Sequence, residues 1–314
     1  MAKSNKKLNI KFGGTAMVAL TLAIILLLSV TVTVAWFINY QINQLGGSTI
    51  TVSGSRVLQF AIIDENDVDN HAYVSQATRN FGEYGLSHVT GNGVEFWIPA
   101  LQQGDVATTP DQNGEWETAV ATDGTAPGDY VHLCIKFFSE DPMDVYLGRE
   151  SSVLPATEAN PSNYGDFSRN NIASASRISF LNTTFDQEGN KTEQFNFVWI
   201  PNALGQLIDN NGRYSFVENG VAESSYSYYY VNSSDEKIAT TWSQSQYVTQ
   251  PTAQASQSPQ DGTGWVTTLQ QGENGEYSAY VSINVWVEGC DRECRRALAG
   301  GRFDVYLQFI GITI

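Results

Sequence analysis

The chain is poor in the residues that most often carry enzymatic chemistry. It contains three histidines and three cysteines in 314 residues. The zinc-protease pattern HExxH, the nucleophile pattern GxSxG, the redox pattern CxxC and a glycine-rich phosphate loop are all missing from it. Carboxylates are so numerous that no pair stands out as a glycosidase dyad. The sequence therefore predicts a protein that is not an enzyme, and it indicates no catalytic, cofactor-binding or metal-binding residue and no cofactor.

The cysteines are also too few for a disulfide framework. Cys290 and Cys294 are four residues apart. They form a local disulfide if the backbone turns between them, or they stay two free buried thiols. An odd number leaves at least one thiol, such as Cys134, unpaired or intermolecular. The histidines do not cluster with the cysteines along the chain, which argues against a zinc site.

Positively charged residues are also few in this chain. The chain has 17 Lys and Arg against 33 Asp and Glu, which gives a formal net charge of −16. Four lysines lie before residue 12, and no acidic residue appears before Asp64. A strongly acidic protein repels nucleic acid, so we expect no nucleic-acid partner.

Only one long apolar run is present, at residues 15–37. It carries no charge, and a helix that crosses a bilayer needs about 20 such residues. We therefore expect a transmembrane helix or signal anchor at 15–37, after a basic cytoplasmic tail at 1–14. The positive-inside rule then places the rest of the chain outside the cell membrane, in a single-pass topology whose membrane partner is this helix.

Two other readings of this start are open. A cleaved signal peptide would use Thr33 and Ala35 as the small residues of a weak site. A type IV prepilin is suggested by Lys11–Gly14, which resembles the end of a prepilin leader, although the acidic residue that follows such leaders is missing.

Behind the apolar run, a polar stem at 38–51 precedes a predicted extracytoplasmic domain at 52–314. Segments with an apolar residue at every second position recur between turns, and no long amphipathic helix is found. This pattern is typical of an all-β fold, an antiparallel β-sandwich. The expected strands are 56–63, 94–98, 115–121, 129–139, 144–147, 177–181, 194–200, 226–231, 276–288 and 302–310.

Three irregular features are expected in this domain. Residues 243–264 are rich in Ser, Gln, Thr and Pro and are predicted to be a flexible loop. Asp291–Leu298 is predicted to be a short helix, because Asp291 suits its N-cap and a double glycine follows it. The last strand, Arg302–Ile310, is expected to pair antiparallel to Glu276–Glu288.

Two polar segments are candidates for a binding site. The acidic segment Asp64–Asn70 does not fit the spacing of a calcium loop, so a solvated turn is expected. In the strand at 129–139, His132 and Cys134 share one face, but the sequence offers no third partner. His132 is therefore interpreted as an ordinary sheet-surface residue.

Three stretches resemble a known family. Ala35–Phe37 with Asn39 resembles the start of camelysin and TasA-type matrix fibre proteins and their relatives in Gram-positive bacteria. Two further stretches resemble recurring patterns in surface proteins with this N-terminus: 177–180 with 199–202, and 285–289 with Asp291, Cys294 and the glycines 300–301. The resemblance implies a jelly-roll-like sandwich outside the cell that can assemble into fibres, and it carries no catalytic residue.

These observations predict a non-enzymatic, membrane-anchored cell-surface protein with a structural, scaffolding or adhesive role. Its expected partners are its own copies or other cell-surface components. The alternative is an extracellular module that binds glycan or cell wall. It rests on the aromatic residues Tyr226, Tyr228, Tyr229 and Tyr230, which otherwise are ordinary sheet-surface residues.

Overall fold

The computed structural model describes residues 49–314 except 55–57, 66–67, 69–70, 81–85, 101–109, 125, 156–171, 187, 202–225, 255–256, 292–293 and 295–300. The predicted basic tail, the apolar run at 15–37 and residues 38–48 of the stem lie outside the described residues. In the part of the chain that is described, no helix combines the length and the apolar character that crossing a bilayer requires.

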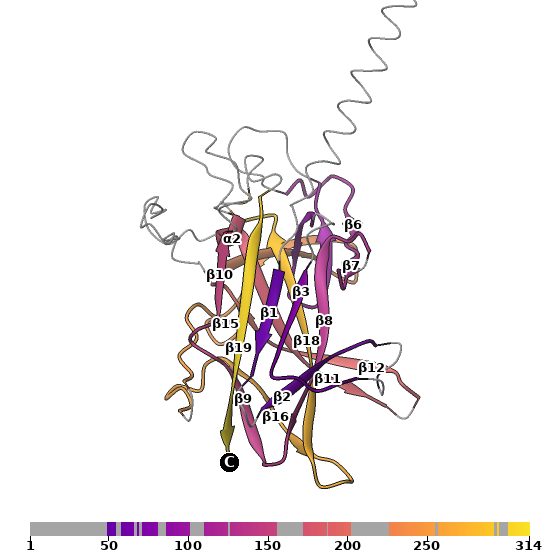
Figure 1. Ribbon diagram of the computed structural model, residues 1–314. Coiled ribbons are helices and arrows are strands. Elements are labelled where there is room, and N and C mark those ends of the chain that lie inside the picture. The colour runs from indigo at the N-terminus through magenta and orange to yellow at the C-terminus, as the bar shows by residue number, and fades with distance from the viewer. Residues whose placement is uncertain are drawn as a thin grey trace, which may run out of the picture. The chain divides into compact units, whose positions relative to one another are not determined.

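Two large sheets and one small hairpin account for most of the described chain (Figure 1). The first sheet has six strands, in the order β16 (Trp265–Thr268), β9 (Met143–Leu147), β19 (Phe303–Thr313), β1 (Thr49–Ser53), β3 (Gln76–Asn80), with β10 (Ser152–Pro155) also paired to β19. The only helix among the described residues is α2 (Ile172–Ala175), a single turn before β11.

The second sheet has eleven strands. Its main path is β15 (Tyr247–Val248), β12 (Lys191–Trp199), β11 (Ser176–Phe185), β18 (Tyr277–Glu288), β4 (His88–Gly91), β5 (Phe96–Ile98), β6 (Glu117–Thr118). Four more strands join it: β8 (Tyr130–Ser139) and β17 (Gln270–Gln271) on β18, and β2 (Gln59–Ile63) and β7 (Ala121–Thr122) on β8. The hairpin β13 (Ser227–Val231) and β14 (Lys237–Thr241) forms the third sheet.

The sheets are mixed, which corrects the prediction of a purely antiparallel fold. Four strand pairs run parallel: β1 with β19, β12 with β15, β18 with β4, and β7 with β8. The strand-rich, helix-poor class follows from the alternating sequence pattern. Strand direction does not, because alternation reports only which face of a strand is buried.

One hydrophobic core takes side chains from both large sheets. On β8 and β18 every second residue points into it, as the alternation predicted, and these residues are 0–2% exposed: Val131, Leu133, Ile135, Phe137, Val281, Ile283, Val285 and Val287. The first sheet contributes residues that are 0–1% exposed: Ile50, Val52, Val145, Leu147, Phe303, Val305, Leu307 and Phe309. Burial of each such side chain contributes about 1.5–3 kcal/mol.

The last strand is paired differently from the prediction. β19 runs antiparallel to β9 and β10 and parallel to β1, and it belongs to the first sheet. β18 belongs to the second sheet, between β11 and β8. Each strand directs one alternating face into the core, and the two strands face each other across the core rather than lying side by side in one sheet. The prediction that β19 pairs with Glu276–Glu288 was therefore wrong.

Several predicted boundaries also differ. β1 begins at Thr49, inside the predicted stem at 38–51. The predicted flexible loop at 243–264 contains β15 and the buried residue Ala253, which bridges to Gly148. Most of the predicted helix Asp291–Leu298 lies outside the described residues. The local disulfide between Cys290 and Cys294 is not formed, and Cys134 is in no disulfide either.

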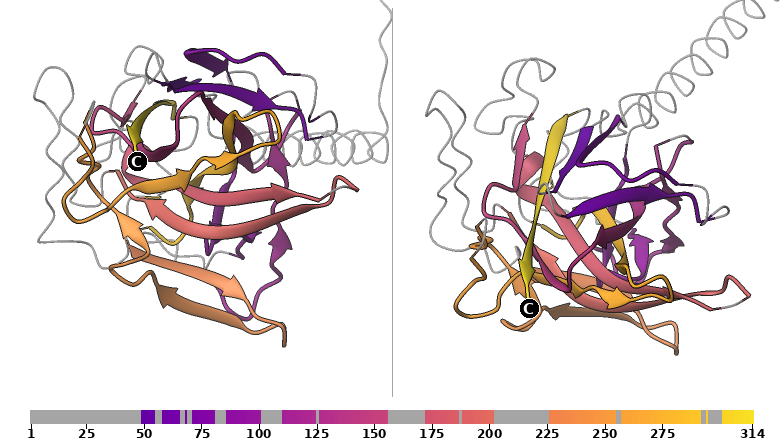
Figure 2. Two further views of the ribbon diagram at one scale, coloured as in Figure 1. Left: turned by 90° about the horizontal axis from the view of Figure 1, so that it is seen from below. Right: turned by 60° about the horizontal axis from the view of Figure 1, so that its bottom comes forward.

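The hairpin of β13 and β14 covers part of the outer face of the second sheet, beside β11 and β12 (Figure 2). Its aromatic residues pack there against a second, smaller core around Trp242 and Trp286. Elsewhere on the outer face, side chains of β8 and β12 and of the turn after β2 approach one another. The candidate site lies at this place.

Candidate functional site

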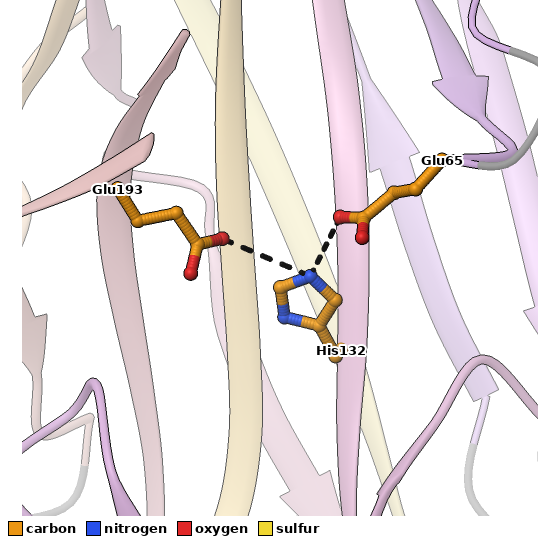
Figure 3. Close-up of side chains that lie close together, drawn as sticks. All are labelled: Glu65, His132 and Glu193. Atoms are coloured by element: carbon orange, nitrogen blue, oxygen red, sulfur yellow. Dashed lines mark hydrogen bonds and ion pairs between the residues drawn. The ribbon is translucent and has the colours of Figure 1, made fainter. Parts of the chain in front are cut away.

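His132 lies between two glutamates on the outer face of the second sheet (Figure 3). Its Nε2 atom is 2.9 Å from Oε1 of Glu65 and 3.9 Å from Oε1 of Glu193. One nitrogen or oxygen atom from each of the three side chains lies within 4.8 Å of the other two. The side chains of His132, Glu65 and Glu193 are 17%, 31% and 21% exposed, so solvent reaches the group.

Strand register explains how these residues meet. β2 pairs antiparallel to β8 with Ile63 opposite Cys134, so Glu65, two residues further on, arrives beside His132. Glu193 comes from β12, the second strand of the hairpin that β11 begins. The prediction of a solvated turn at Asp64–Asn70 is therefore incomplete, because the partly exposed Glu65 side chain also bonds to His132 on the sheet surface. Residues 66, 67, 69 and 70 lie outside the described residues.

Lys191 places a cation among these three side chains. Its Nζ atom is 2.9 Å from both carboxylate oxygens of Glu65, 3.1 Å from Oε1 of Glu193 and 3.2 Å from Nε2 of His132. We call Glu65, His132, Lys191 and Glu193 the His132 cluster. Two carboxylates and one ammonium leave it with a net negative charge when the imidazole is neutral.

A row of buried polar groups orients the imidazole from behind. Asn284, opposite His132 on β18, donates from Nδ2 to the carbonyl oxygen of Gly93 at 3.0 Å and to Oγ of Ser179 at 3.2 Å. Its Oδ1 atom therefore faces Nδ1 of His132, at 2.6 Å. An amide oxygen only accepts hydrogen bonds, so Nδ1 carries the proton. In the neutral imidazole the lone pair is then on Nε2, which points to Glu65 and Lys191.

Gly93 is suited to this supporting role by its backbone. Its φ is +92°, and a Cβ atom there would approach a ring carbon of Phe195 to 2.8 Å and the Cβ of Ser179 to 3.1 Å. Glycine alone tolerates this conformation and this close approach. Its carbonyl oxygen accepts from Asn284 and, at 2.6 Å, from the hydroxyl of Ser179, which ties the loop between β4 and β5 to the sheet.

The contacts within the His132 cluster shift the pKa values of its members. The hydrogen bond from His132 lowers the pKa of Glu65 to about 2, helped by Lys191 and opposed by burial. Burial disfavours the charged form of His132, but hydrogen bonds to Glu65 and Asn284 outweigh it and raise the pKa of the imidazole. Burial is likewise outweighed at Lys191, whose pKa is raised by Glu65 and Glu193. The cluster therefore favours the charged forms of all three groups.

A second polar group is fully buried near the end of β18. Arg177 and Asp291 form an ion pair whose side chains are both 0% exposed. Glu288 accepts hydrogen bonds from the Cys290 thiol at 2.9 Å, the Cys290 amide at 3.2 Å and the Trp286 indole at 3.0 Å. We call Arg177, Glu288, Cys290 and Asp291 the Glu288 cluster. Burial raises the pKa of the Glu288 carboxyl. Burial also raises the pKa of the Cys290 thiol, and the neighbouring Glu288 carboxylate raises it further.

The tyrosines named for glycan binding lie on and beside β13 and are half-buried. Tyr226 and Tyr228 pack on the smaller core, with ring centroids 4.6 Å from Tyr247 and 4.4 Å from Trp242, respectively. The ring of Tyr229 lies beside that of Trp116, with 6.0 Å between the ring centroids. A pocket of 290 Å³ lies elsewhere, around Arg149, Val153, Trp199 and Pro251, and none of these tyrosines lines it. Their rings therefore serve packing at least in part.

Sequence reasoning placed His132 on the outer face of its strand but missed its partners. Glu65 is 67 residues from His132 and Lys191 is 59 residues from it. Lys191 and Glu193 are neighbours on one face of β12, but no spacing pattern connects them to His132 or to Glu65. The only sequence signal was a histidine on the polar face of a strand.

Comparison with known proteins adds no relative. No protein-family model, curated protein or solved structure matches the chain. The resemblance to camelysin and TasA-type proteins stays a prediction.

Proposed function

We propose that the protein is a non-enzymatic cell-surface protein, anchored by residues 15–37 in the cell membrane, with a structural, scaffolding or adhesive role. The observation that carries the proposal is the position of β1. This strand follows the predicted anchor closely and lies inside the first sheet, hydrogen-bonded to β19 on one side and to β3 on the other. A membrane tether would thus connect directly to the core of the exported domain.

The same proposal treats the two large sheets as the layers of a jelly-roll-like β-sandwich. The shared core between them supports this architecture. The acidic composition supports an exposed, soluble exterior. Self-association into fibres would extend the scaffold, and electron microscopy of the purified full-length chain would reveal such fibres.

Surface display tests the role itself. We expect cells that express the full chain to aggregate or adhere more than cells without it. Val52→Asp, which buries a charge under β1, should remove the gain at equal amounts of anchored protein. Thr51→Asp places the same charge on the other face of β1 and should retain the gain. Equal adhesion with and without the chain would contradict the proposal.

Membrane topology is tested separately with cysteine labelling, after the native cysteines are changed to Ser. A cysteine at Lys6 should resist an impermeant thiol reagent in intact cells, and Gln244→Cys, at an exposed position, should react. The reverse pattern would contradict the proposed orientation. Mass spectrometry should find Trp36 still joined to the apolar run, whereas a new N-terminus near Trp36 would show that the anchor is cleaved.

Glycan binding is the second candidate function, because parts of the β13 tyrosine rings reach solvent. A glycan array with the full-length chain tests it, with Tyr229→Ala and Tyr230→Ala as variants. Tyr226 and Tyr228 are left intact because they pack on the smaller core. Binding that survives both substitutions would contradict a role for these rings.

A further inference from the structure

We propose that Glu65, His132 and Glu193 bind a divalent first-row transition-metal ion, most favourably Zn²⁺, which takes the place of the Lys191 ammonium. This site goes beyond the proposed surface role and does not rest on it. A metal bound there would join the turn after β2, strand β8 and strand β12, which are remote in sequence.

The donor atoms are close to the spacing that a metal ion needs. Zinc–nitrogen and zinc–oxygen bonds of about 2.0–2.2 Å place the donors of a tetrahedral site roughly 3.3–3.6 Å apart. Nε2 of His132 is 2.9 Å from Glu65 and 3.9 Å from Glu193, on either side of that value. The donor atoms lie within 4.8 Å of one another, so the two flexible carboxylates must move closer together to complete three protein ligands, and water would fill the fourth position.

The second observation is the support behind the histidine. Metal-binding histidines commonly donate their other ring N–H to an oxygen that fixes the ring and its tautomer. Here the oxygen is Oδ1 of Asn284, which accepts from Nδ1 of His132, and the Asn284 amide nitrogen donates in turn to Gly93 and Ser179. When the imidazole gives up its Nε2 proton, the Nε2 lone pair is directed at the two carboxylates, as a metal ligand requires. An isolated surface histidine needs no such buried support.

Lys191 shows that the cluster already holds a cation. Its ammonium contacts all three proposed ligands at 2.9–3.2 Å. One positive charge offsets only half of the charge of two carboxylates, whereas a divalent ion offsets all of it. The side chain of Lys191 is 26% exposed and lies at the start of β12, so the ammonium has a way out to solvent.

The mixed donor set favours zinc over the hard cations. Imidazole suits Zn²⁺ and its first-row neighbours, while Ca²⁺ and Mg²⁺ prefer oxygen ligands throughout. A ring nitrogen at the middle of the site therefore discriminates against calcium and magnesium.

Calorimetric titration of the metal-free full-length chain with Zn²⁺ tests the proposal. We expect one zinc ion per chain, no comparable binding of Mg²⁺, and loss of the zinc site in His132→Gln. Co²⁺ should give the visible absorption bands of a low-coordinate site in the native chain and not in His132→Gln. Circular dichroism would show that each variant is folded.

Exchange with the ammonium makes a sharper prediction. Lys191→Met removes the competing charge beside the ligands and should strengthen zinc binding by about tenfold or more. Lys136→Met is the matched control, because Lys136 shares the outer face of β8 with His132 but lies over the ring of Tyr280 at 5.0 Å. It should leave the affinity nearly unchanged.

Two results would overturn the proposal. One is a native chain that shows no zinc binding dependent on His132. The other is a Lys191→Met chain that binds zinc no better than the native chain or the Lys136→Met control. Either result would leave Lys191 as a fixed partner in an ordinary ion-pair network.

Discussion

The His132 cluster and the Glu288 cluster each contain two carboxylates and one lysine or arginine, but they differ in burial. In the Glu288 cluster the Arg177 and Asp291 side chains are both 0% exposed, and Glu288 accepts three hydrogen bonds from protein groups. In the His132 cluster every member is in partial contact with water. A buried charge must be satisfied by the protein alone, while a half-exposed one can exchange its partner for an ion from solution.

This difference indicates separate roles for the two polar groups. The Glu288 cluster fixes the end of β18 against β11, and removal of one member of the Arg177–Asp291 pair leaves the other charge buried away from solvent. The His132 cluster holds two carboxylates and a histidine where ions from solution can reach them. Four predictions test the contrast, in order of the size of the expected effect.

The largest effect is expected at Asp291. Asp291→Ala leaves the guanidinium of Arg177 buried without its carboxylate, which should lower the free energy of unfolding by about 3–5 kcal/mol. Urea denaturation of the full-length chain measures it. The double variant Arg177→Met with Asp291→Leu should lose clearly less, because apolar side chains of similar size replace both charges. If Asp291→Ala lowered the free energy of unfolding by less than about 1 kcal/mol, the Arg177–Asp291 pair would behave like an exposed ion pair, and the proposed difference between the two clusters would be wrong.

The next effect concerns zinc affinity and the support behind His132. Asn284→Leu removes the acceptor that fixes the imidazole, and we expect zinc binding to weaken by about 10–100-fold. Thr183→Val is a matched loss of a buried hydroxyl on the same sheet, since Thr183 bonds to Ser282 rather than to His132. Equal losses in the two variants would show that the effect is one of general stability.

The two clusters should also respond to pH in opposite directions. The pKa of Glu65 is lowered from 4.5 to about 2, so its contribution to stability is present above pH 4.5 and is lost as the pH falls toward 2. The pKa of Glu288 is raised from 4.5, so its contribution is present below pH 4.5 and is lost as the pH rises through the raised value.

Glutamine variants separate these contributions in urea denaturation at a series of pH values, with a chelator present. Glu65→Gln should remove part of the fall in stability on the acid side of pH 4.5, and Glu288→Gln part of the fall on the alkaline side. Curves that keep the native slope in either variant would show that the carboxylate does not titrate as its surroundings indicate.

The smallest effect is expected for Lys191 without metal. Lys191→Met in chelator should change the free energy of unfolding by less than about 1 kcal/mol, because half-exposed ion pairs are screened by water. The same substitution changes zinc affinity strongly in the proposal above. A loss as large as that of Asp291→Ala would instead show that Lys191 is an essential structural cation.

Sequence reasoning succeeded where the answer depends on a single strand. The alternation in Asp129–Ser139 predicted both the strand and its buried face, and the same holds for Glu276–Glu288. It failed where the answer depends on which strands pair. The position of β19 in the first sheet and the parallel pairs follow from the packing of the whole core, which no local pattern encodes.

The candidate site shows the same limit more sharply. His132 was correctly placed outward, but Glu65 reaches it only through the register of β2 on β8. Glu193 and Lys191 reach it only through the hairpin of β11 and β12. The pairing of strands that are distant in sequence therefore makes His132 a member of a charged cluster, which the sequence around it does not indicate.

The parallel pairing of β1 and β19 has a mechanical consequence. The two strands run in the same direction, with Ile50 paired to Val305. β1 therefore enters the first sheet at the end where β19 begins, and β19 finishes near the opposite end (Figure 1). An eleven-residue strand such as β19 is roughly 35 Å long. A tether before β1 and a load at the C-terminus would pull the two strands in opposite directions along their axes. Hydrogen bonds loaded in this way must break together rather than peel apart one by one, so the pair would resist tension between the two ends of the domain.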